Sequence, residues 1–262
     1  MCGSIKPDQS EDVDFKIQLK KTDVNLNKTQ LLKELKKFRS QIKSNLSLPG
    51  LITGEPVVRN EGRYSRIELN YSSFFSAGTA LRPHILLEFT LSNIRLAVDS
   101  LSIRTIIEDH LKNVNLFASS STLCVSVNET AIEKWVALTR RIIAIDRAYH
   151  ADDKTLIRHI YDLNAIKCAD KIHANFFILA KAIVSNDSRQ FKKQHPEYAS
   201  NPEAEIRQSL SLLKNKPIWK ERYQEFIDTM VYDKATTLEY ENVLAGIEHL
   251  SEIAINSLNT EG

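Results

Sequence analysis

Two aspartates near the start of the chain, Asp12 and Asp14, have the type and spacing of metal ligands. From Val13 to Leu19, apolar and polar residues alternate, which is typical of a half-buried strand and places both carboxylates on one face. Carboxylates this close repel each other unless a cation lies between them, and hard oxygen ligands suit Mg²⁺. Such a pair holds the metal in phosphoryl transfer. On this short motif alone, a solvated acidic turn is the more common explanation.

A third carboxylate on a neighbouring strand would complete such a site, and two predicted strands provide candidates. Glu68 alternates with apolar residues in the strand predicted over 63–71, so a place on its polar face explains this residue. Glu88 instead interrupts an apolar run in the strand predicted over 82–90, where a charge needs a partner such as a metal or an arginine. We therefore predict that Glu88 binds the metal or takes the proton of the attacking hydroxyl.

Charged residues also recur at helical spacing in the second half of the chain. Lys134 and Arg141 lie on one side of a predicted helix, where cations could hold a triphosphate. Arg158 and Asp162 are four residues apart, a spacing at which they can form an intrahelical ion pair. For each of these residues taken alone, a surface or interhelical salt bridge is the more common explanation.

The elements that must position these residues divide the chain into two parts. Up to about residue 117, short strands accompany one helix, predicted over 28–45 from its apolar stripe. Beyond residue 126, helices are predicted over 128–149, 155–166, 172–184, 202–213, 218–230 and 236–258. This order predicts an α+β fold, with a small mixed-sheet domain over 1–122 and an α-helical bundle domain over 123–262.

The helix predicted over 28–45 has a second face rich in cations, namely Lys33, Lys36, Lys37, Arg39 and Lys43. This face is a candidate contact for an RNA backbone, although a solvated lysine face is the more common explanation. The whole chain gives no electrostatic argument for nucleic acid, because 35 Lys and Arg residues nearly balance 33 Asp and Glu residues. Any such argument must therefore come from local patches.

Composition and hydropathy indicate an ordinary globular protein. The 262 residues are 42% hydrophobic and 26% charged, which is sufficient for a substantial core. No uninterrupted apolar segment approaches the length of a membrane span, and the N-terminus lacks the pattern of a signal peptide. We therefore predict a cytoplasmic protein without a membrane partner.

Four motifs in order resemble those of the AbiEii/MenT-type nucleotidyltransferases, toxins of abortive-infection and type IV toxin–antitoxin systems. The motifs are Ser-Glu-Asp-x-Asp-Phe from residue 10, Arg-Pro-x-Ile-x-Leu-Glu-Phe from residue 82, Thr-x-x-x-Lys-x-x-Ala from residue 130 and Arg-His-x-Tyr-Asp-Leu from residue 158. No single motif is decisive, but the series is fairly specific and runs over most of the chain, from residue 5 to about 250. The resemblance implies a polymerase-β-like nucleotidyltransferase domain joined to a helical bundle.

The resemblance also implies a role for individual residues. The implied catalytic residues are Asp12, Asp14, Glu88, Lys134 and Asp162, of which the first two bind Mg²⁺, and the implied nucleotide-binding residues are Ser10, Lys134 and Arg158. The implied reaction transfers a nucleotide from a nucleoside triphosphate to an acceptor, for some members the 3′ end of tRNA. The implied partners are therefore the nucleotide, an RNA acceptor and a cognate antitoxin.

Two departures from the family pattern qualify this hypothesis. The family carries a Gly-Gly/Ser turn upstream of the aspartates that grips the nucleotide phosphates, whereas Gly3 and Ser4 lie too close to Asp12 and follow no apolar strand. The chain is thus expected to be N-terminally incomplete, with impaired phosphate positioning and a loss of activity as one outcome. In addition, His159 stands where many relatives carry an acidic residue. The competing hypotheses are a non-enzymatic module that binds a partner such as an antitoxin, and a nucleotide-binding regulator without turnover.

Overall fold

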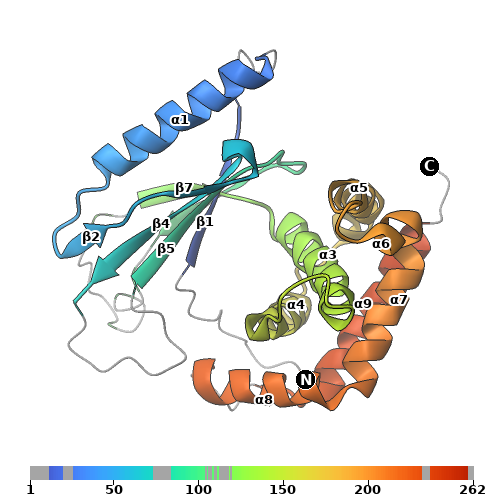
Figure 1. Cartoon of the computed structure of the whole chain (residues 1–262). Helices are drawn as coiled ribbons and strands as arrows, with labels where there is room; N and C mark the ends of the chain where they lie inside the picture. Colours follow the sequence, from blue (N-terminus) through green and yellow to red (C-terminus); the bar gives the residue numbers. More distant parts are fainter. Residues whose placement is uncertain are drawn as a thin grey trace. The chain divides into compact units, whose positions relative to one another are not determined.

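The computed structural model describes residues 12–19, 26–72, 84–103, 105, 108, 111, 118, 120–231 and 237–258. The chain divides into two compact units between Arg95 and Leu96. The first contains a sheet and one helix, and the second contains a two-stranded ribbon and the remaining helices (Figure 1). This division by compactness does not test the predicted domain boundary between residues 122 and 123, which we retain as a proposal.

The sheet unit is a mixed sheet with one long helix. Its elements are β1 (Asp12–Ile17), α1 (Lys28–Asn45), β2 (Leu51–Thr53), β3 (Val57–Arg59), the short 3₁₀ helix η2 (Asn60–Gly62), β4 (Tyr64–Tyr71) and β5 (His84–Leu91). The strand order is β1-β5-β4-β2, and β3 also pairs with β4. β1 runs parallel to β5 and the other pairs are antiparallel, so the predicted mixed sheet is confirmed.

One face of this sheet is apolar and packs against α1. Its buried core consists of Ile67, Leu69, Leu87 and Phe89. The ring of Phe89 stacks on Phe15 with centroids 5.0 Å apart and meets Phe38 of α1 edge-on at 6.0 Å. Phe15 is nevertheless 44% exposed and Val13 is 42% exposed, so the apolar face of β1 is less buried than the sequence predicts. Among the described strands, β1 pairs only with β5, so one of its sides has no strand neighbour there.

The bounds of α1 agree with the helix predicted over 28–45. The helix begins with a capping box, in which the Asn27 side chain accepts a hydrogen bond from the Gln30 backbone N–H at 3.0 Å. The Gln30 side chain in turn accepts one from the Asn27 N–H at 3.0 Å. Two of the N–H groups that a helix start leaves unpaired are thereby satisfied.

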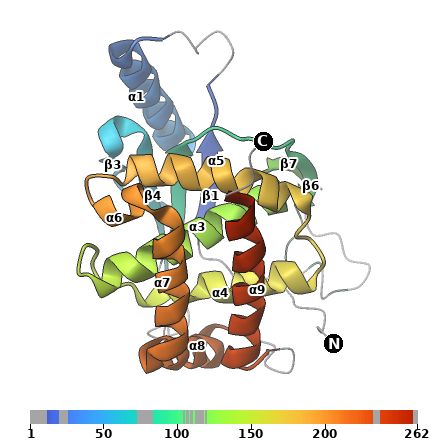
Figure 2. The ribbon, with the colours of Figure 1, turned by 90° about the vertical axis from the view of Figure 1, so that its right-hand side faces the viewer.

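The second unit consists mainly of helices. Its elements are β6 (Asp99–Ile103), β7 (Ser120–Cys124), α3 (Val127–Asp146), the 3₁₀ helix η3 (Lys154–Ile157), α4 (Arg158–Cys168), α5 (Ala174–Gln190), α6 (Pro196–Ser200), α7 (Pro202–Asn215), α8 (Pro217–Met230) and α9 (Tyr240–Leu258). Each helix predicted beyond residue 126 is present. Helix α3 lies among its neighbours and contacts α4, α5 and α7 (Figure 2). None of the helices that the structure describes is long and apolar enough to cross a membrane.

Aromatic side chains fill much of the core of the helical unit. Trp135 and Phe176 are fully buried, with ring centroids 6.3 Å apart, and Trp219 is 3% exposed. The indole N–H of Trp135 donates a hydrogen bond of 2.8 Å to Ser251 Oγ, which joins α3 to α9. These tryptophans therefore serve packing rather than base stacking.

Replacing Trp135 by alanine is expected to lower the free energy of unfolding by about 3–5 kcal/mol, because it leaves a large cavity and an unpaired Ser251 hydroxyl. Urea denaturation followed by circular dichroism measures this change. The matched control is Ile218→Ala on α8. The Ile218 side chain is 42% exposed, so its removal should lower the free energy of unfolding much less. Equal losses in the two variants would contradict the assignment of Trp135 to the core.

Candidate functional site

The sheet face opposite α1 carries the predicted carboxylates. In the parallel pair of β1 and β5, Asp14 lies in register with Glu88, and Asp12 lies in register with Leu86. Register partners point to the same side of a sheet, as do alternate residues of one strand. Asp12, Asp14 and Glu88 therefore share one face, which is the opposite of the face that holds Phe15 and Phe89.

Glu88 has a hydrogen-bonding partner on the adjacent strand. The hydroxyl of Tyr64 on β4 donates a hydrogen bond to Glu88 Oε1. Burial, and then this hydrogen bond and the glutamate charge, raise the pKa of Tyr64 to about 12, so the phenol remains a donor at neutral pH. Arg66 lies opposite Glu88 in the register of β4 and β5. The sequence predicted a metal or an arginine as the partner of Glu88 and missed Tyr64, which a diagonal cross-strand relation could have suggested.

The carboxylates on this face fit Mg²⁺ by their donor chemistry. In the described part of the chain, no group of three or more His, Cys, Asp or Glu side chains is arranged to hold a metal ion. Mg²⁺ is usually bound by one or two carboxylates, with substrate phosphates and water as further ligands. Asp12 is half-buried and Asp14 is exposed, so both aspartates are accessible from solvent. Ser10, predicted to contact the nucleotide, and the Gly3-Ser4 pair lie outside the described residues.

In the helical unit, the predicted Lys134 and Asp162 form an ion pair. Lys134 Nζ of α3 lies 2.7 Å from Asp162 Oδ2 of α4, and the two side chains are 29% and 26% exposed. The alternative of an intrahelical pair between Arg158 and Asp162 is wrong, because packing of α3 against α4 supplies a different cation. Arg158 is half-buried and forms no ion pair with any residue that the structure describes. Lys134 is thus held in place from an adjacent helix, and Arg158 is not.

Arg141, two turns after Lys134, is also held by an acid from beyond α3. Its guanidinium binds Asp153. Asp153 caps the 3₁₀ helix η3, because its other oxygen accepts hydrogen bonds from the Thr155 N–H at 2.9 Å and from the Thr155 hydroxyl at 2.7 Å. Burial opposes ionisation of Asp153, but the Thr155 hydroxyl and the Arg141 charge outweigh it and lower the pKa of the carboxyl. Lys134 and Arg141, both on α3, are therefore each paired with a carboxylate from a segment outside α3.

His159 lies within this group of charges. Its Nδ1 is enclosed and makes no hydrogen bond to the described residues. Burial, followed by the positive charges of Lys134, Arg141 and Arg158, lowers the pKa of His159 to about 3. The imidazole is therefore neutral at neutral pH.

The stability of the protein should consequently fall as pH drops below about 6.5, because the unfolded chain protonates His159 there while the folded chain does so only near pH 3. Between pH 7 and pH 5.5 this group alone should cost about 1 kcal/mol of unfolding free energy. Urea denaturation at the two pH values measures the loss, with His159→Asn as the comparison. The same pH dependence in both proteins would show that His159 is protonated equally in the folded and unfolded states.

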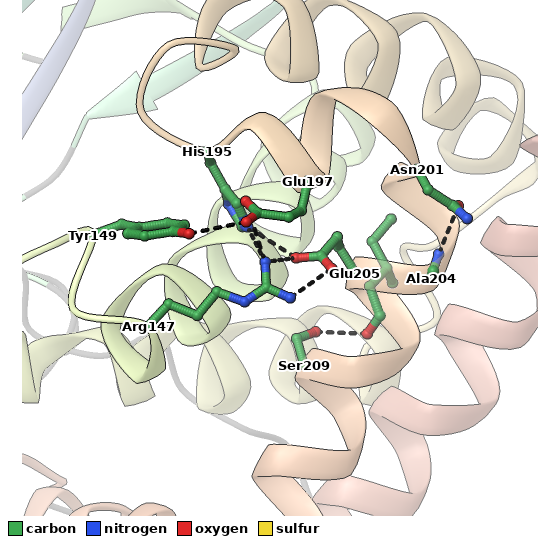
Figure 3. Close-up of polar contacts among 9 residues, drawn as sticks. Arg147, Tyr149, His195, Glu197, Asn201, Ala204, Glu205 and Ser209 are labelled. Atoms are coloured by element: carbon green, nitrogen blue, oxygen red, sulfur yellow. Dashed lines mark hydrogen bonds and ion pairs between the residues drawn. The ribbon is translucent and has the colours of Figure 1, made fainter.

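A second polar cluster, near the end of α3, has a structural role (Figure 3). Arg147 donates two hydrogen bonds to Glu205 of α7, at 2.5 and 2.8 Å, and His195 Nε2 lies 2.9 Å from the same carboxylate. The hydroxyl of Tyr149 donates to Glu197 of α6 at 2.9 Å. These contacts join the end of α3 to α6 and α7, although His195 Nδ1 is buried and makes no hydrogen bond to the described residues. No sequence pattern indicates this cluster, because its members are scattered between Arg147 and Glu205, which are 58 positions apart.

A mixed sheet with paired aspartates, followed by a helical bundle, defines an α+β protein with a nucleotidyltransferase-like fold. A family model described as the nucleotidyl transferase AbiEii toxin of type IV toxin–antitoxin systems matches residues 9–246. The chain therefore belongs to this family, and the resemblance drawn from its four motifs is confirmed. Comparisons with curated proteins and with solved structures yield no match. Membership implies a nucleoside triphosphate substrate and a cognate antitoxin partner.

Proposed function

We propose that this protein is a cytoplasmic, Mg²⁺-dependent nucleotidyltransferase that adds a nucleotide to the 3′ end of tRNA. The main support beyond the family match is the strand register that sets Asp14 beside Glu88 on one face of the sheet. A metal-binding carboxylate next to a carboxylate able to accept a proton is the pairing that nucleotidyl transfer requires.

In this reaction the RNA 3′-hydroxyl oxygen forms a bond to the α-phosphorus of the nucleoside triphosphate. The bond between the α-phosphorus and the bridging oxygen breaks, and pyrophosphate leaves. Glu88 accepts the hydroxyl proton, while Tyr64 binds its Oε1 and orients the carboxylate. Asp12 and Asp14 would hold Mg²⁺, which supplies positive charge to the phosphate oxygens when bound.

The helical unit contributes cations in this proposal. Lys134 binds the nucleotide phosphates, and Asp162 keeps its ammonium in position before the nucleotide arrives. Arg158, which has no ion pair among the described residues, provides a second phosphate-binding group. Ser10 is the remaining proposed nucleotide contact.

The direct test is incubation of the protein with Mg²⁺, each labelled nucleoside triphosphate in turn, and total tRNA. We expect label on tRNA, lost with EDTA and in Asp14→Asn. Nucleotide binding that needs Mg²⁺ but gives no transfer would indicate a regulator instead. A protein that shows neither property but binds an antitoxin would be an interaction module. The same assay on a chain extended upstream tests whether a Gly-Gly/Ser turn is needed.

A further inference from the structure

The near-neutral charge of the whole chain conceals an uneven distribution between its two units. Residues 9–95, the sheet unit, contain 14 Lys and Arg against 9 Asp and Glu, a net charge of +5. The other residues contain 21 Lys and Arg against 24 Asp and Glu, a net charge of −3. The sheet unit is therefore the part of the molecule with an electrostatic preference for anions.

Helix α1 accounts for this excess, since it carries six of the cations and a single acid, Glu34. Three of the six are held by the sheet unit itself. Lys28 pairs with Glu61 at 2.8 Å and Lys43 pairs with Glu55 at 2.5 Å. Arg39 donates a hydrogen bond of 2.9 Å to the Gly62 carbonyl.

The other three cations, Lys33, Lys36 and Lys37, are exposed and form no ion pair with the described residues. Their spacing of three and four residues places them along one stripe of the helix, together with Ser40. Like charges at this spacing destabilise a helix slightly, and Glu34 makes no ion pair that would offset them. The stripe lies on the side of α1 away from Leu31 and Leu35, which are buried.

We propose that Lys33, Lys36 and Lys37, the lysine stripe, bind the phosphate backbone of the acceptor RNA. The stripe contains no apolar residue, whereas the cores of protein interfaces are apolar and depleted in lysine. Nucleic-acid interfaces are instead polar and strongly positive. The inference rests on the proposed function in naming the RNA acceptor as the ligand.

The position of the stripe indicates which part of the RNA it binds. Helix α1 covers the sheet face that holds Phe89, and Asp14 and Glu88 lie on the opposite face. The stripe therefore contacts the body of the RNA, at a distance from the reacting 3′-hydroxyl. Its loss should raise KM for RNA and leave kcat unchanged, because the contact is the same in the ground state and in the transition state.

The test compares two triple variants that each lose three exposed lysines. The stripe variant is Lys33→Gln, Lys36→Gln, Lys37→Gln, and the control on the helical unit is Lys171→Gln, Lys192→Gln, Lys193→Gln. Binding of total tRNA is measured by fluorescence anisotropy over a series of salt concentrations. We expect the stripe variant to bind at least about tenfold more weakly and its log–log salt slope to flatten by about 2–3, while the control matches the wild type.

Equal tRNA affinity and salt slope in the stripe variant and the wild type would overturn the proposal. So would unchanged tRNA binding with weakened binding of an antitoxin, which would identify an acidic protein as the occupant. Circular dichroism confirms that each variant is folded. Binding of tRNA does not require catalysis, so the Asp14→Asn variant should still bind tRNA. If the lysine stripe binds tRNA but the protein transfers no nucleotide, only the proposed enzymatic function is refuted.

Discussion

Asp14→Asn should lower the rate of nucleotide transfer by a factor of about 10² to 10³ or more, with the fold intact. The amide removes one of the two negative charges that would hold Mg²⁺, and removal of one electrostatic contact in a preorganised site typically has an effect of this size. Asp14 is exposed, so its replacement buries no unpaired group and should hardly change stability. Single-turnover transfer at saturating nucleotide measures the effect.

Two controls test whether the loss of activity is specific to Asp14 and whether it arises from metal binding. Asp99→Asn removes a similar exposed carboxylate from β6 and should leave the rate unchanged. Raising the Mg²⁺ concentration should partly restore Asp14→Asn if the defect lies in metal binding. An Asp14→Asn protein with wild-type activity would exclude this aspartate from the reaction and remove the central support for the proposed mechanism.

The role of Glu88 is tested by a pair of matched substitutions on the same sheet face. Glu88→Gln should slow transfer by about 10² to 10⁴, because an amide cannot accept the hydroxyl proton. Glu68→Gln makes the same chemical change on β4, in register with Leu86, and should have little effect. Similar losses in both variants would indicate a general effect of charge on this face.

Lys134→Met should weaken nucleotide binding about 10- to 100-fold, the second large effect that we expect. The methionine keeps the packing of the side chain but removes the ammonium proposed to bind phosphate. It also leaves the Asp162 carboxylate, 26% exposed, without the cation that lies 2.7 Å away. Equilibrium binding of a labelled nucleoside triphosphate with Mg²⁺ measures the change.

A double-mutant cycle separates the roles of Lys134 and Asp162. If Asp162 acts by positioning the ammonium, Asp162→Asn should lose nucleotide affinity in the wild type but lose nothing further in the Lys134→Met background. The control is Lys216→Gln, which breaks the ion pair between Asp146 at the end of α3 and Lys216 between α7 and α8. A similar loss of nucleotide affinity in Lys216→Gln would show that any broken ion pair suffices.

Local sequence patterns predicted the helices well, and they predicted short strands poorly. The helix over 28–45 was predicted at both ends, because its apolar stripe and its cap agree. The predicted domain boundary between residues 122 and 123 falls inside a strand, because Ser120–Cys124 forms β7. Its serines have no apolar alternation, and pairing with β6 determines its conformation.

Of the candidate site, the sequence predicted the residues but not their partners. Alternation placed Asp12 and Asp14 on one face of a strand, and the interruption of an apolar run indicated Glu88. Only the register shows that Asp14 and Glu88 adjoin. For Asp162, the cation four residues earlier was the local candidate, but Lys134 is its partner. Partners from other elements depend on packing, which is not encoded in the spacing along one helix.

The parallel pairing of β1 with β5 also determines when the candidate site can form. Asp14 and Glu88 are adjacent in the sheet but 74 positions apart in the chain, with α1 and β2 to β4 between them. Closing so long a loop is slow, and the local pairing of β4 with β5 does not require it. A ribosome must therefore complete most of the sheet unit before the two carboxylates can meet. β1 is synthesised before β5 but is expected to be among the last of the described strands to join the sheet, so a toxin assembled in this order has no complete carboxylate face until β5 has been made.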